Sequence, residues 1–205
     1  MATPVVSIYN QKGGSGKSML TVHLAVAAFL AGLKVAVLDL DPQGSATDWF
    51  TQRSADAGPT VVKIPDNALD RAVAGAKADG FDLIIIDSPP RVSPATARII
   101  GIADLVLVPV RPQRFDMRAL PATLKLVGDK PYAFVLSDCP QRAPEIEKRR
   151  QELMAYKRPI FGPIQNWRSF WRALETGEAV SEFEPEGEPA KEIQAIFEAM
   201  MKELA

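Results

Sequence analysis

The feature that most constrains this chain is a glycine-rich segment between an apolar stretch and a helix-like stretch near the N-terminus. Residues 4–9 are expected to form a β-strand, and Lys17 to Ala31 a helix, because apolar side chains recur there near helical spacing. The intervening glycines let the backbone turn tightly and point successive N–H groups inward, and the positive end of the helix also attracts anions. This order of elements predicts a phosphate-binding loop.

Two lysines and a serine complete this loop, which reads Lys12-Gly13-Gly14-Ser15-Gly16-Lys17-Ser18. The standard pattern G-x-x-x-x-G-K-[ST] has a glycine where this chain has Gln11, and Lys12 is an additional lysine. We expect Lys17 to neutralise phosphate charge and the Ser18 hydroxyl to bind Mg²⁺. The residues expected to contact the nucleotide here are Gly13, Gly14, Ser15, Gly16, Lys17, Ser18 and Met19.

Apolar runs alternate with helix-like stretches along the rest of the chain. The run at residues 81–87 is continuous, which is typical of a strand covered on both faces. An exposed loop is expected at residues 177–189, which are acidic and contain two prolines. Further strands are expected at residues 34–40, 60–64, 104–110, 132–137 and 159–164, and helices at 43–54, 67–78, 94–102, 114–127, 143–156, 166–175 and 188–204. The alternation predicts an α/β fold with a mostly parallel, twisted sheet flanked by helices on both faces.

Composition excludes several kinds of protein. The chain has 205 residues with one cysteine and one histidine, so we expect neither a disulfide framework nor an iron–sulfur or multi-histidine metal site. No apolar run approaches the roughly 18–20 residues of a membrane span, so we expect a cytoplasmic protein. Internal repeats and low-complexity linkers are not evident, and residues 1–205 are therefore expected to form a single domain.

Charge is unevenly distributed along the chain, although the net charge is only −1. Residues 142–174 hold eight basic and three acidic residues, whereas residues 175–205 hold two basic and nine acidic ones. Within the basic block, Arg168 and Arg172 lie four positions apart and share one face of a predicted helix. Two tryptophans, at positions 167 and 171, share the adjacent face. Such a helix either binds a partner through its arginines or is a solvated surface whose tryptophans belong to the core.

Four motifs in order resemble those of one family. The loop resembles the deviant Walker A box, K-G-G-x-G-K-[ST], of the ParA/MinD ATPases. Residues 39–43 resemble the D-x-D-P-Q switch I of the ParA branch, residues 84–90 its Walker B and switch II segment, and residues 109–112 its P-x-x-P segment. The short length resembles the ParF-like subgroup. The resemblance implies a P-loop NTPase fold. Larger members of the family have a helix-turn-helix domain before the first strand, whereas this sequence starts directly at that strand, so no such domain is expected.

The resemblance implies individual roles in an ATPase that uses ATP and Mg²⁺. Lys12 is expected to reach across an ATP-bound homodimer into the nucleotide site of the partner. Asp41 is expected to position or activate the attacking water. Asp87 is expected to support Mg²⁺ together with Ser18, and Asp39 either does the same or caps a loop. The expected catalytic residues are thus Lys12, Lys17 and Asp41.

Recognition of the nucleotide base is the open part of this interpretation. Relatives often place an Asn or Arg after the strand that corresponds to residues 132–137, whereas this chain has Ser137-Asp138-Cys139-Pro140. The candidates for contacting the base are Asp138 and backbone groups from Pro112 to Phe115. The resemblance favours ATP, although residues 137–140 alone do not distinguish a preference for adenine from one for guanine.

The resemblance to the ParA branch implies a nucleotide-switched positioning ATPase. ATP-bound dimers are expected to bind DNA non-specifically and to associate with the nucleoid. A ParB-like or other cargo-adaptor protein is expected to stimulate an ATP hydrolysis that is slow alone. The cargo is a plasmid, a chromosome or a protein assembly, and the sequence leaves these open. The expected DNA contacts are Arg168, Arg172, Lys148, Arg149 and Arg150.

Two alternatives share this fold. A MinD-like membrane-associated regulator needs a basic amphipathic C-terminal helix. Residues 190–205 instead carry Glu192, Glu198 and Glu203 against two lysines, so no membrane partner is expected. A metabolic enzyme or kinase needs a second substrate site, for which the sequence offers no candidate constellation, and the D-P-Q segment favours the ParA branch.

Overall fold

The computed structural model describes residues 3–54, 57–90 and 92–205. Within these residues, seven strands form one sheet in the order β3-β2-β4-β1-β5-β6-β7, and all neighbouring strands are parallel. The α/β fold with a mostly parallel sheet is therefore confirmed. The strands are β1 (Val5–Ile8), β2 (Val35–Asp39), β3 (Thr60–Lys63), β4 (Leu83–Asp87), β5 (Leu105–Val110), β6 (Tyr132–Leu136) and β7 (Ile160–Phe161).

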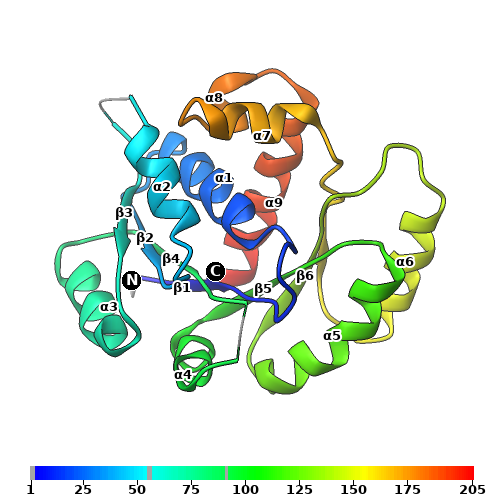
Figure 1. Cartoon of the computed structure of the whole chain (residues 1–205), viewed down its shortest axis with the longest axis horizontal. Coiled ribbons are helices and arrows are strands. Elements are labelled where there is room, and N and C mark those ends of the chain that lie inside the picture. The colour runs from blue at the N-terminus through cyan, green and yellow to red at the C-terminus, as the bar shows by residue number, and fades with distance from the viewer. Residues whose placement is uncertain (1–2, 55–56, 91) are drawn as a thin grey trace.

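Helices cover both faces of this sheet (Figure 1). One face is covered by α1 (Lys17–Leu30), α2 (Ser45–Gln52), α7 (Arg168–Glu175), α8 (Val180–Phe183) and α9 (Glu188–Leu204). The other face is covered by α3 (Leu69–Ala78), α4 (Pro94–Ile102), α5 (Arg114–Val127) and α6 (Glu145–Met154), with a short 3₁₀ turn at Asp66–Ala68 before α3. Among the described residues, no helix is both long enough and apolar enough to cross a membrane.

Alternating side chains along each strand fill the two layers of core. In β4, Leu83 and Ile85 pack with the helices of the first face, whereas Ile84 and Ile86 pack toward the second. All four side chains are fully buried. A strand in the middle of a parallel sheet needs apolar residues on both sides, which explains why residues 81–87 read as one continuous apolar run.

Helix α1 lies at the centre of the first layer and contacts α2, α8, α9 and the sheet. His23 lies within this helix and is fully buried. Its Nδ1 accepts a hydrogen bond from the backbone N–H of Val180 at 3.2 Å, and its ring meets Phe170 edge-on with centroids 5.0 Å apart. The imidazole therefore links the helix that follows the glycine-rich loop to both α7 and α8.

The segment 177–189 differs from the sequence expectation of an exposed loop. Residues Val180–Phe183 form α8, and Val180 is fully buried against α1. Arg53 holds the start of this segment, because its guanidinium donates to the Gly177 carbonyl at 3.1 Å and to the Glu182 carboxylate at 2.8 Å. The acidic residues and prolines hid a short helix whose stability depends on these tertiary contacts.

Acidic pH should weaken the fold through His23. Burial lowers the pKa of its imidazole to about 3. The unfolded chain protonates this ring below about pH 6.5, whereas the folded protein keeps it neutral. The stability that His23 contributes is therefore complete above pH 6.5 and is lost as the pH falls toward 3. We expect its contribution to the unfolding free energy to fall by about 2 kcal/mol between pH 7 and pH 5.

Urea denaturation of the wild type and of His23→Gln at these two pH values measures the change. The variant should be less stable at pH 7, because the packing against Phe170 is altered. It should also lose less stability than the wild type on acidification, since glutamine does not titrate. Equal losses in the two proteins would assign the acid sensitivity to other groups.

Candidate functional site

The predicted site residues gather at the carboxyl edge of the sheet, where the first strand runs into the glycine-rich loop. The pairing of the strands places Ile8 beside Asp87, and Asp87 beside Asp39. The end of β1 therefore lies next to the ends of β4 and β2. Ligands of open α/β sheets bind at this edge, near the point where the strand order reverses.

Backbone conformation requires glycine at two positions of the loop. Gly14 has φ +70° and Gly16 has φ +89°, both in the left-handed region. A Cβ atom at Gly14 would meet nothing within 4 Å, so the restriction comes from the backbone and not from crowding. Gly13 and Gly14 are exposed at the surface. The loop thus has the open, strongly turned backbone that a phosphate cradle needs.

Lys17 begins α1 and is almost completely buried, with 5% of its surface exposed. Burial lowers the pKa of its ammonium group, and the nearby carboxylates of Asp87 and Asp41 oppose this shift. One buried cation thus lies close to two buried carboxylates. The structure brings these three residues together, as the sequence predicted.

Asp87, at the end of β4, is fully buried, and neither of its carboxylate oxygens accepts a hydrogen bond of normal geometry from the described residues. Burial raises its pKa to about 7, and the charge of Asp39 adds to the increase, whereas Ser18 and Lys17 lower it. The hydroxyl of Ser15 is also buried without a partner. Unpaired buried polar groups are costly, so these groups point to a ligand that completes them.

A magnesium–nucleotide complex fits these groups. Asp87 and Ser18 supply the oxygen donors that Mg²⁺ prefers. The backbone N–H groups of the loop and the ammonium of Lys17 supply positive charge for phosphates. When bound, the metal offsets the charge that builds up on the transferred phosphoryl group.

Asp39 serves a structural role that the sequence left as an alternative. Its Oδ1 accepts from the backbone N–H of Asp41 at 3.1 Å. Its Oδ2 accepts from the backbone N–H and the hydroxyl of Thr47, at 3.0 and 2.7 Å. Both oxygens are thus used to hold the start of α2, where a negative charge is favourable. The magnesium role expected of Asp39 stays a prediction.

Asp41 is 6% exposed and belongs to the predicted switch I segment. Its Oδ1 accepts from the backbone N–H of Gln43 at 2.9 Å. It lines a cavity of about 270 Å³ together with residues from both predicted switch segments, namely Pro42, Gln43, Pro89 and Pro90. This position suits the predicted contact with an attacking water.

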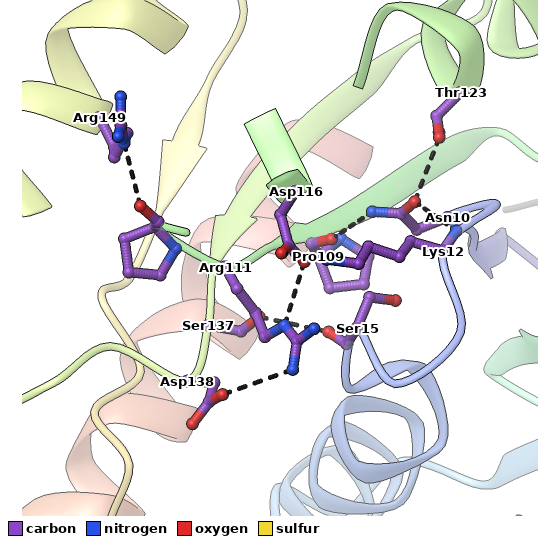
Figure 2. Close-up of polar contacts among 11 residues, drawn as sticks. Asn10, Lys12, Ser15, Pro109, Arg111, Asp116, Thr123, Ser137, Asp138 and Arg149 are labelled. Carbon is purple, nitrogen blue, oxygen red and sulfur yellow. Dashed lines mark hydrogen bonds and ion pairs between the residues drawn. The ribbon is translucent and has the colours of Figure 1, made fainter. Parts of the chain in front are cut away.

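A network of side chains fixes the entrance to the loop (Figure 2). The amide of Asn10 donates to the Pro109 carbonyl at 2.7 Å. Its Oδ1 accepts from the backbone N–H of Lys12 at 2.9 Å and from the Thr123 hydroxyl at 3.1 Å. Asn10 therefore joins the loop to the P-x-x-P segment and to α5, a role that local sequence reasoning missed.

Lys12 forms an ion pair within its own chain, with the Oδ2 of Asp116 (Figure 2). Only 1% of the Asp116 side chain is exposed, and its Oδ1 accepts from Arg111 Nε at 3.0 Å. Arg111 also lies 3.8 Å from the Asp138 carboxylate. Asp116 is the second site residue missed by the sequence, and its proximity to the P-x-x-P segment was the available signal.

A second cavity, of about 440 Å³, opens beside the loop. Gly14, Ser15 and Gly16 form one side, and Trp167 and Trp171 lie on another. Trp171 is 51% exposed, so it is not a core residue. Asp138 lines this cavity, whereas residues 112–115 do not, and the Pro112 carbonyl already accepts from Arg149 Nε at 2.9 Å. Of the two expected base contacts, the structure places only Asp138 at the cavity.

The five basic residues expected to contact DNA divide into two groups. Arg168, Arg172 and Lys148 are exposed, the first two on α7. Arg149 is half-buried and also pairs with Glu152 at 2.7 Å, and Arg150 donates to the Gly162 carbonyl at 2.6 Å. The guanidinium groups of Arg149 and Arg150 are therefore bound within the chain. Of the five residues, the cations exposed to solvent are thus Lys148 and the two arginines of α7.

Removing the charge of Asp87 should stabilise the protein when no ligand is bound. Because folding raises the pKa of this carboxyl from 3.8 to about 7, the fold loses stability as the pH rises from about 4 to about 7, and the loss is complete above pH 7. We expect Asp87→Asn to raise the unfolding free energy at pH 8 by about 1–3 kcal/mol. The gain should be smaller at pH 6 by about 1 kcal/mol, because the folded carboxyl is then largely protonated although the unfolded one is already ionised. The same variant should lose the added stability that magnesium and nucleotide give to the wild type.

Urea denaturation at both pH values, with and without magnesium and nucleotide, checks this prediction. Asp129→Asn is the control, because Asp129 is exposed. A loss of stability in ligand-free Asp87→Asn at pH 8 would contradict the assignment of a destabilising buried charge.

Comparison with known proteins extends this description. Residues 6–180 match the family described as CobQ/CobB/MinD/ParA nucleotide binding domain. Maintenance of carboxysome distribution protein A from Gloeobacter kilaueensis is 28% identical over 206 residues, which cover 98% of this chain and 93% of that protein. The chromosome-partitioning ATPase Soj from Thermus thermophilus is 28% identical over 147 residues, which cover 58% of this chain and 59% of that protein.

A solved structure shares the fold at low identity. Cobyrinic acid a,c-diamide synthase from Mycobacterium smegmatis, solved with bound ADP and magnesium, has a TM-score of 0.79 and 19% identity to this chain. The match covers 98% of this chain and 95% of that one. At this identity the likeness shows the fold alone. The sequence match over residues 6–180 shows more: the chain belongs to the CobQ/CobB/MinD/ParA family of nucleotide-binding domains.

Proposed function

We propose that this chain is a ParA-type ATPase that positions DNA or protein cargo through ATP-switched, non-specific binding to DNA. The observation that carries the proposal is that α7 lines the cavity beside the phosphate loop and also carries the exposed Arg168 and Arg172. Relatives named for partition and for carboxysome distribution support it. In this proposal the protein is cytoplasmic and nucleoid-associated, and a ParB-like or other cargo-adaptor protein stimulates hydrolysis.

The reaction is hydrolysis of ATP to ADP and phosphate. Lys17 and the loop backbone hold the phosphates, and Ser18 and Asp87 hold Mg²⁺. Asp41 orients the attacking water at the wall between the switch segments. The buried positions of Lys17 and Asp41 strengthen these electrostatic interactions, because the local dielectric constant is lower than in water.

ATP-dependent dimerisation requires Lys12 to change partners. In one chain its ammonium is paired with Asp116, so it must leave this carboxylate to reach a nucleotide in a second copy. The departure does not strand a buried charge, because Arg111 still donates to Asp116. The intramolecular pair therefore opposes dimerisation by a modest free energy, and ATP phosphates in the partner compensate for it.

Neutralising Asp116 should strengthen the ATP-bound dimer. Asp116→Asn keeps the shape of the side chain and removes the charge that holds Lys12. A partly exposed ion pair is worth about 1 kcal/mol, and two are broken per dimer, so we expect the dimer dissociation constant to fall by about thirtyfold. Sedimentation velocity with ATP and Mg²⁺ measures it.

Asp129→Asn is the control, since it removes an exposed carboxylate just after the same helix without touching Lys12 or the cavity beside the loop. A dimer that is unchanged or weaker in Asp116→Asn would show that the Lys12–Asp116 pair does not oppose dimerisation.

DNA binding should depend on two arginines from each protomer. The slope of log K against log salt concentration is negative, and each phosphate contact makes it steeper by about 0.9. Loss of Arg168 and Arg172 removes four cations from a dimer, so Arg168→Ala/Arg172→Ala should make the slope shallower by up to about 4. Binding of a random-sequence duplex across a salt series, with ATP, ADP or no nucleotide, measures this effect.

Two controls separate DNA contact from general charge loss. Arg71→Ala/Arg98→Ala removes the same charge from exposed positions on the opposite face and should leave binding nearly unchanged. Lys17→Ala should abolish the ATP dependence. If the wild type forms ATP-bound dimers that do not bind the duplex at any salt concentration, the DNA-based function is excluded.

A further inference from the structure

The cavity of about 440 Å³ beside the phosphate loop has the size of a small-molecule site, which is typically about 300–1,000 Å³. It begins at the loop glycines Gly14 and Gly16 and continues past Met19 to α7. A nucleotide whose phosphates are bound by the loop, as in the proposed function, would extend its ribose and base into this space. Its lining also includes the segment 165–167, which belongs to the basic block of residues 142–174.

This segment is held at two places by the backbone. Gln165 forms a parallel β-bridge with Cys139, and the N–H of Asn166 donates to the Cys139 carbonyl at 3.0 Å. The N–H of Trp167 donates to the Gln165 carbonyl at 2.9 Å, which closes a tight turn. Side chains of this turn therefore start from a fixed position next to the cavity.

A carboxylate from α9 completes the support. Glu192 Oε2 accepts from the backbone N–H of Gln165 at 2.9 Å and from the indole Nε1 of Trp167 at 3.1 Å. The indole N–H is the single polar group of a tryptophan side chain, so this bond restricts rotation of the ring. Burial raises the pKa of Glu192, and the two donors oppose that increase, which shows how closely they surround the carboxylate.

We infer that Glu192 is a positioning residue for the nucleotide base, because it fixes Trp167 and the turn 165–167 on the wall of the base cavity. Glu192 itself is not among the residues that line this cavity, so it acts through the turn. An aromatic side chain contributes to the binding of any planar base. The amides of Gln165 and Asn166 add paired donors and acceptors of the kind that suit adenine. The inference takes the adenine base from the proposed function and otherwise rests on this geometry.

The test compares a ligand that has a base with one that lacks it. Dissociation constants of ADP, GDP and pyrophosphate, each with Mg²⁺, are measured by equilibrium dialysis. ADP is used because it reports on a single chain without ATP-driven dimerisation. The proteins are the wild type, Glu192→Ala, Glu192→Gln and Trp167→Ala. Glu198→Ala is the matched control, since Glu198 is exposed on the same helix and its carboxylate accepts a hydrogen bond from Gln194 at 2.9 Å.

We expect Glu192→Ala and Trp167→Ala to raise the dissociation constant of ADP by about tenfold and to leave that of pyrophosphate within about twofold. Glu192→Gln keeps an oxygen acceptor and should recover most of the affinity. Glu198→Ala should match the wild type. Thermal unfolding of each variant accompanies the binding data, because a purely structural role would lower stability and weaken both ligands together.

Three results would overturn the inference. ADP affinity that is unchanged in Glu192→Ala shows that the turn does not position the base. An equal loss for ADP and pyrophosphate shows that Glu192 supports the whole fold. A wild type that binds ADP no more tightly than pyrophosphate shows that the base lies outside the cavity. ATP-dependent DNA binding by the same wild-type preparation reports on the proposed function separately, so the two can fail independently.

Discussion

The site depends on a carboxylate that the fold buries with less stabilisation than its charge needs. Asp87 is the last residue of β4, a central strand whose side chains are enclosed on both faces. The sheet therefore fixes its position, and neither oxygen accepts a normal hydrogen bond from the described residues. Lys17 opposes the cost from one side. The fold is therefore less stable without a ligand, and a ligand that supplies a cation gains affinity because it removes this cost.

The loop that faces Asp87 is itself held from a distance. Asn10 connects it to Pro109 and Thr123, and Lys12 reaches Asp116. These partners all belong to β5 or α5, so movement of that segment and movement of the loop are linked. In the dimer that we propose, exchange of the Lys12 ion pair would give the linkage two discrete states, which is the kind of element that a nucleotide switch requires.

Local pattern was enough to predict the phosphate loop, the parallel sheet and the position of Asp87, since each depends on residues adjacent in sequence. Local pattern could not predict contacts between segments that are distant in sequence. Asp116 lies 104 positions from Lys12, and Glu192 lies 25 positions from Trp167. Composition also misled: acidic residues and prolines concealed α8, and two arginines that read as a free basic run are bonded to carbonyls of the chain. The structural role of Asp39 depends on a hydrogen bond from the Thr47 hydroxyl, which only the structure reveals.

The order of the strands also bears on how the chain is made. Among the described strands, β1 is synthesised before the others but lies between β4 and β5. One of its edges therefore lacks a neighbour until residue 87 has been made, and the other until residue 110. The helix that follows it packs against α9, which ends at Leu204. An emerging chain therefore leaves this apolar strand and helix without these contacts until β4, β5 and α9 have been made. Chaperones that shield apolar segments have their longest opportunity at this N-terminal unit.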